Sequence, residues 1–151
     1  MEAVTEGRPI TIQYGIRFFV EKNTLFIELP SKRRLAYLNP SVRPGPYGDV
    51  LAYEGMDQTT KRWTVQETYG GKIAENIVQA VARDCLADAM LRLDKLGYEI
   101  VMHVHDEVVI EAKADAGSLK EVTSLMSKPI SWAPGLPLNA EGFETPYYKK
   151  D

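Results

Sequence analysis

The chain has 151 residues, of which 44% are hydrophobic and 26% are charged, a balance typical of one soluble globular domain. A net charge of −3 argues against a free-standing nucleic-acid-binding protein, and no apolar run approaches the ~20 residues that a membrane helix needs. The acidic N-terminus is unlike a signal peptide, and the single cysteine, Cys85, excludes a disulfide framework and fits a reducing, cytoplasmic setting.

The charge is unevenly distributed along the chain. Residues 1–74 hold ten Lys/Arg and eight Asp/Glu, a net +2, whereas residues 75–151 hold eight and thirteen, a net −5. Most exposed carboxylates are simply solvated. A site that binds cations would also concentrate carboxylates in this half of the chain.

The first seventy residues are rich in β-branched and aromatic residues. Short runs in partial alternation, separated by turns, predict a β-meander over residues 10–20, 24–29 and 34–38. Several Pro and Gly residues predict a loop over 39–49. A further strand pair is expected at 50–54 and 62–66, around Gly55-Met56-Asp57.

A long amphipathic helix is predicted from Lys72 to Leu96, where the sequence has no Pro and no internal Gly. Gly97 then provides a stop. Apolar residues recur at every fourth position of this stretch, at Ile73, Ile77, Val81, Cys85, Ala89 and Leu93, widened by Val78, Leu86, Met90 and Leu96.

The remaining elements complete an α+β arrangement. Residues 98–104 and 108–112 predict a hairpin, residues 115–126 a shorter helix, and residues 136–148 a final strand. Because strands and helices do not alternate as βαβ units, both helices are expected to pack on an antiparallel sheet. Residues 1–70 form the β-rich region and residues 71–151 the remainder of one compact unit.

The hairpin turn, His105-Asp106-Glu107, breaks the preference of short turns for Asn-Gly, Asp-Gly or Gly-X. Local rules are often broken at functional sites. A carboxylate at a hairpin tip between buried strands suits a divalent cation such as Mg²⁺, which prefers oxygen ligands. Adjacent side chains on extended backbone point to opposite faces, so Asp106 and Glu107 are not equal ligands, and a further carboxylate must come from elsewhere.

Two other interpretations of this turn stay open. One is a loose turn with polar tips, and the other is a metal-dependent hydrolase site in which His103, His105 and Asp106 bind Zn²⁺. The chain has only these two histidines and no cysteine near them in sequence.

The segment His103-Val104-His105-Asp106-Glu107-Val108-Val109 resembles motif C of family A DNA polymerases, the class of bacterial DNA polymerase I and its phage relatives. In that family a palm helix just upstream carries a glutamine followed five residues later by an aspartate, and here Gln79 and Asp84 have that spacing. The segments at 29–37, 69–79 and 136–142 resemble the phage or mobile-element branch, so the resemblance spans nearly the whole chain.

The resemblance implies a role for each matching residue. Asp106 is expected to be a catalytic metal ligand in a two-metal Mg²⁺ site, Glu107 an auxiliary acidic group and His105 a contact to the primer backbone. Gln79 is expected to touch the nucleic acid in its minor groove, and Arg83, one turn later, to meet a phosphate. Glu75 stands where relatives have an asparagine, which leaves the role of that turn open, and Lys32-Arg33-Arg34 is either a solvated turn or a phosphate contact.

Two family motifs are not found in the chain. No strand resembles motif A, which supplies the second aspartate. Lys61 has the motif B spacing to Tyr69-Gly70, but Asp57 stands where an arginine belongs, and the residues between favour strand or loop. We therefore expect a C-terminal palm fragment that is inactive alone. It would work in DNA replication with primer-template, deoxynucleoside triphosphates and the domains or partner polypeptide carrying motifs A and B. The alternative is a non-catalytic nucleic-acid-binding or assembly module.

Overall fold

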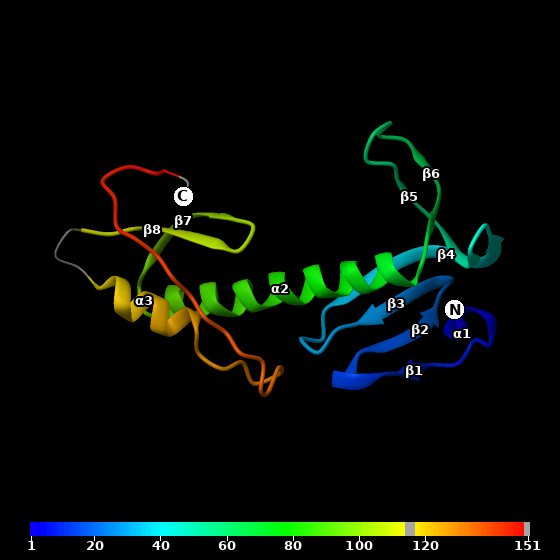
Figure 1. The fold of residues 1–151 in the computed structure, drawn as a ribbon, viewed down its shortest axis with the longest axis horizontal. Helices are drawn as coiled ribbons and strands as arrows, with labels where there is room; N and C mark the ends of the chain where they lie inside the picture. Colours follow the sequence, from blue (N-terminus) through cyan, green and yellow to red (C-terminus); the bar gives the residue numbers. More distant parts are fainter. Residues whose placement is uncertain (114–116, 150–151) are drawn as a thin grey trace. The chain divides into compact units, whose positions relative to one another are not determined.

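The computed structural model describes residues 1–113 and 117–149, and its fold is α+β, as predicted (Figure 1). It contains a six-stranded antiparallel sheet, a long helix and a shorter helix. Two compact units, Met1–Val81 and Ala82–Asp151, divide inside the long helix α2, Gly70–Lys95. The domain boundary expected at residue 70 stays a prediction. Within the described residues, none of the helices has the length and apolar character needed to span a membrane.

The sheet of the first unit is a meander in which each strand pairs with the next one along the chain. Its strands are β1 (Ile10–Thr11), β2 (Arg17–Glu21), β3 (Thr24–Glu28), β4 (Arg34–Gly45), β5 (Gly48–Met56) and β6 (Trp63–Thr68). A short helix, α1 (Glu2–Thr5), precedes them. The strand expected over residues 10–20 is instead broken by the 3₁₀ turn Gln13–Gly15, because Tyr14 and Gly15 adopt φ of 60° and 74°.

The loop predicted over residues 39–49 is wrong, because most of this stretch belongs to strands β4 and β5. The ladder between these strands skips Asn39 and Pro40, and Asn39 has a φ of 47°. Such a bulge accepts a proline, since no ladder hydrogen bond is required of its missing N–H group. Regular pairing then resumes at Ser41 and continues to Gly45.

The core of the first unit lies between one sheet face and the beginning of α2. Ile27 and Leu29 are fully buried, and each contributes roughly 1.5–3 kcal/mol by leaving water. Ile77 and Ala80 of α2 belong to the same cluster. Tyr37 is fixed within it by the side chain of Asn76, which donates a hydrogen bond of 3.0 Å to the phenol oxygen.

The basic turn at Lys32-Arg33-Arg34 makes contacts inside the chain. Arg33 donates to the backbone carbonyl of Ala80 in α2 at 2.7 Å. Lys32 and Arg34 both pair with the carboxylate of Glu28, at 3.6 and 3.2 Å. These cations therefore help to join the turn to the sheet and to the helix.

The second unit contains the hairpin β7 (Glu99–Val104) and β8 (Glu107–Glu111), and helix α3 (Leu119–Met126). Ser118 caps α3 by accepting a hydrogen bond from the backbone of Glu121. At its other end, Arg92 of α2 donates to the carbonyls of Leu125 and Lys128, at 2.7 and 3.1 Å. Buried apolar residues of this unit are Leu86, Ala89, Leu93, Leu125 and Ile130.

Three expectations about α2 and the C-terminal half need correction. Val78 and Leu96 do not widen the buried stripe of α2, since they are 65% and 59% exposed. Helix α3 begins at Leu119, and the start expected at Asp115 lies outside the described residues. Residues 127–149 contain no strand, so the strand expected at 136–148 is wrong. Prolines 129, 134, 137 and 146 remove ladder donors from this segment.

Candidate metal-binding turn and adjacent helix

The hairpin turn consists of His105 and Asp106, because Val104 pairs directly with Glu107. Glu107 is therefore the first residue of β8 and not part of the turn. His105 adopts a φ of 52°, a conformation that costs a non-glycine residue about 1 kcal/mol or more. A turn of this geometry favours glycine or asparagine at that position, so the sequence here accepts local strain.

The carboxylates of Asp106 and Glu107 are exposed at this tip. Among the described residues, no hydrogen bond or ion pair involves the side chains of Asp106, Glu107 or His105. Their oxygen atoms therefore stay available to an external cation, and hydrated Mg²⁺ needs only one or two protein carboxylates. Because the two side chains are adjacent in sequence, they offer separate ligands and not one bidentate pair.

The strands that carry the turn are less buried than the sequence indicates. Val101 and Met102 are 50% and 38% exposed. Val104, Val108 and Ile110 are only partly buried. The prediction that buried strands flank the turn is therefore wrong for this chain by itself, although the hairpin and its apolar character are as expected.

Helix α2 contacts the hairpin through Arg83. Its guanidinium donates to Nε2 of His103 at 3.3 Å. Since an arginine cannot accept, this contact requires His103 to carry its proton on Nδ1. The contact joins residues twenty positions apart and was not predicted from the sequence. One turn earlier on α2, Gln79 is exposed, and it belongs to the first compact unit.

Two further helix residues bear on the family pattern. Glu75, for which the sequence resemblance left the role open, forms an ion pair of 3.0 Å with Lys72. The adjacent Asn76 has a structural contact, because its side chain donates a hydrogen bond to the buried Tyr37. Asp84 is half-buried and has an interaction partner.

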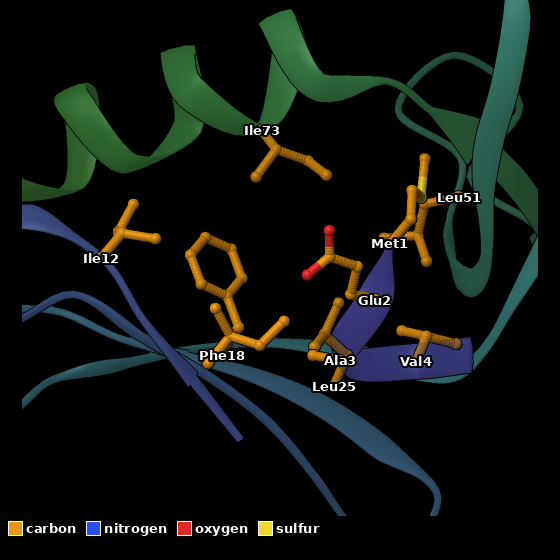
Figure 2. A pocket seen from close by; sticks show the side chains of 10 residues that line it. Met1, Glu2, Ala3, Val4, Ile12, Phe18, Leu25, Leu51 and Ile73 are labelled. Carbon is orange, nitrogen blue, oxygen red and sulfur yellow. The ribbon is translucent and has the colours of Figure 1, made fainter. Parts of the chain in front are cut away.

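A metal centre made only from residues 1–113 and 117–149 is not present, since no group of three or more His, Cys, Asp or Glu side chains gathers there. The zinc interpretation built on His103, His105 and Asp106 has no such cluster in its favour, and His103 is already bonded to Arg83. An apolar cavity of about 400 Å³ lies in the first unit. Figure 2 shows Glu2 directed into it, and every other lining side chain is apolar.

Comparison with known proteins finds similarity to a phage DNA polymerase. The DNA polymerase of Bacillus phage SP02 is 50% identical over 153 residues, which cover all of this chain and 24% of the phage protein. The chain thus spans about a quarter of the length of that relative. No family model matches the chain, and no solved structure matches it.

Proposed function

We propose that this chain is the C-terminal palm portion of a family A DNA polymerase of the phage type. The observation that carries the proposal is the exposed Asp106 carboxylate, without a partner among the described residues, on a strained hairpin turn. The similarity to a phage DNA polymerase over the whole chain supports the same assignment.

In this proposal Asp106 binds Mg²⁺ and Glu107 acts as an auxiliary acidic group. Bound Mg²⁺ supplies stabilisation of the attacking and leaving oxygens during nucleotidyl transfer. Among the described residues we assign one metal-binding turn, and in this proposal the second aspartate comes from a motif A strand elsewhere in the complete enzyme. The chemistry of the donors fits this ion, because both are carboxylates that are free to take a hydrated cation.

The same proposal gives three other predicted residues contacts to the primer-template. His105 approaches the primer backbone from the turn, and Gln79 reads minor-groove acceptors from the exposed face of α2. Arg83 meets a phosphate, and its bond to His103 holds the guanidinium at the hairpin. These are contacts to backbone and shared groove atoms, which suit synthesis on any sequence.

The working partners would be primer-template DNA, deoxynucleoside triphosphates and the polymerase regions that carry motifs A and B. The partial exposure of Val101 and Met102 supports a protein partner that covers the hairpin. Covering apolar side chains stabilises a two-stranded hairpin. We place this activity in DNA replication in the cytoplasm.

A chimera provides the direct test of this function. The segment of the phage SP02 polymerase that matches this chain is replaced by residues 1–151, and primer extension is measured with Mg²⁺ and four nucleotides. We expect extension that Asp106→Asn removes and that Asp94→Asn, a matched exposed aspartate at the end of α2, leaves intact. Extension at an unchanged rate by the Asp106→Asn chimera would overturn the proposal.

The isolated chain tests the claim that its site is incomplete. We expect negligible primer extension by residues 1–151 alone. Extension that Asp106→Ala abolishes would show that the incomplete-site claim is wrong. A chimera that folds and binds primer-template but extends nothing would instead favour a non-catalytic nucleic-acid-binding module.

A further inference from the structure

Strand β6 forms one edge of the six-stranded sheet, and among the described residues only β5 pairs with it. Figure 1 shows the β5–β6 hairpin projecting from the rest of the sheet. Two apolar residues of this strand, Trp63 and Val65, are 57% and 48% exposed. An exposed edge strand with apolar side chains is a template for pairing with a strand of another chain.

The hydrogen bonding of the hairpin determines which residues of β6 can pair with a further strand. Next to the turn, the amide of Asp57 donates to the carbonyl of Arg62 at 2.9 Å, so these two residues form a hydrogen-bonded pair. Hydrogen-bonded and non-hydrogen-bonded pairs alternate along an antiparallel ladder. The N–H and C=O groups directed away from β5, toward the open edge, are therefore those of Trp63, Val65 and Glu67.

The side chains of these three residues lie on one face of the hairpin, because side chains alternate along a strand. Met56 stands opposite Trp63 and adds an apolar side chain that is 47% exposed. Glu67 is exposed near one end of β6, and Lys61 is exposed in the turn at the other end. Neither charged side chain has an ion-pair partner within the described part of the chain. The open edge therefore presents, in order, a cation, two apolar side chains and an anion.

This order is complementary to itself in an antiparallel pair. When Trp63 of one copy stands opposite Val65 of a second copy, two-fold symmetry repeats the same pair on the other side of the axis. The same register places Lys61 opposite Glu67 at both ends. Apolar pairs and opposite-charge pairs are both favourable across strands. A register shifted by two residues loses the ion pairs, because it places Lys61 opposite Val65 or Tyr69.

We propose that β6 pairs with β6 of a second copy of this chain, antiparallel and centred on Thr64, so that the two sheets join across a two-fold axis. The contact involves one strand of six residues from each copy. It therefore gives a weak dimer that depends on concentration, and not an obligate one. The dimer does not rest on the proposed polymerase function, because only the edge of the first unit forms it.

Sedimentation equilibrium of the full chain over a range of protein concentrations measures this association. We expect the average mass to rise toward that of two chains as the concentration increases. Val65→Pro should remove the rise, because the amide of Val65 is directed to the open edge and proline is tolerated at such positions of edge strands. The mass of a single chain at every concentration would contradict the proposal.

Charge reversal tests the register of the two strands. Lys61→Glu and Glu67→Lys each replace two attractive pairs by two repulsive ones, so each should weaken association roughly 10-fold or more. An equal mixture of the two variants should associate again, because each glutamate at these positions then faces a lysine of the other chain. The control is Lys22→Glu, which reverses an exposed lysine between β2 and β3 and should associate like the parent chain.

The mixture decides between this edge and any other surface. If the parent chain associates but the mixture associates no better than each variant alone, another surface forms the dimer and the proposal is wrong. Circular dichroism checks the fold of every variant. The charge variants alter only exposed side chains, so they test the interface even if Val65→Pro does not fold. Failure of the dimer leaves the proposed function standing, since primer extension by the chimera is measured separately.

Discussion

Two hairpin turns of this protein each carry an aspartate, and they use it in opposite ways. In the turn between β5 and β6, Asp57 accepts hydrogen bonds from the backbone of Thr59 and Thr60 and from the Thr60 hydroxyl, at 3.0, 2.6 and 2.9 Å. In the turn between β7 and β8, the side chain of Asp106 has no such partner among the described residues.

The difference shows that a carboxylate at a hairpin tip is not by itself a sign of chemistry. Asp57 satisfies backbone donors that its own turn leaves unpaired, which is a common use of aspartate in turns. Asp106 makes no such bonds within the described part of the chain. Both turns hold a non-glycine residue at positive φ, Lys61 at 55° and His105 at 52°, so the state of the carboxylate and not the backbone strain separates them. The available oxygen atoms of Asp106 therefore point to a ligand at the second turn.

The strongest test of this comparison measures both activity and stability after Asp106 is replaced. In the chimeric polymerase, Asp106→Asn should lower the extension rate roughly 100-fold or more, because a lost metal ligand removes several kcal/mol of transition-state stabilisation. Thermal unfolding of the isolated chain should change by less than about 0.5 kcal/mol. A large loss of stability in Asp106→Asn together with an unchanged extension rate would show that Asp106 has a structural role and not a catalytic one.

A smaller effect is expected at the neighbouring carboxylate. Glu107→Gln in the same chimera should lower the extension rate roughly 10-fold, about 1.4 kcal/mol, since we propose an auxiliary group and not a principal ligand. The Mg²⁺ concentration that gives a half-maximal extension rate is measured for both variants, and it distinguishes a principal ligand from an auxiliary group. A loss as large as that of Asp106→Asn would show that both are principal ligands.

Much of the fold was predictable because it follows from local periodicity. Apolar residues at every fourth position predicted α2, and two runs of β-branched residues predicted the β7–β8 hairpin. The loop expected at 39–49 was wrong because Pro40 lies in a bulge, where sequence composition resembles a loop but pairing continues on both sides. The strand expected at 136–148 was wrong because Pro137 and Pro146 remove ladder donors from this segment.

The candidate site was predictable only in part. His105-Asp106 was recognisable because it breaks a turn preference, which is a local property. The bond between Arg83 and His103 was not, since it depends on how a helix and a hairpin meet.

A third prediction concerns the strain at the second turn. His105→Gly should leave thermal stability unchanged or raise it by up to about 1 kcal/mol, because glycine adopts positive φ without steric cost. Extension by the chimera should fall several-fold, since the proposed contact to the primer backbone is lost. Asparagine, which also tolerates this conformation, is the matched control for the backbone. A clear loss of stability in His105→Gly would show that the turn is held by contacts of the imidazole.

The smallest effect on activity is expected for a change at Asp57 in the first turn. This change should alter only the stability of the fold. Hydrogen bonds, first of all from the backbone of Thr60 and then from its hydroxyl, hold the pKa of Asp57 below its ordinary 3.8. A lowered pKa means that the ionised carboxylate stabilises the fold above the ordinary value, and that this contribution disappears as pH falls through the folded-state pKa. Asp57→Ala should therefore unfold at a lower temperature than the parent chain at pH 7, and the two melting curves should converge in acid. Primer extension by the chimera should be unchanged. Parallel melting curves at every pH would show that Asp57 acts through its shape and not through its charge.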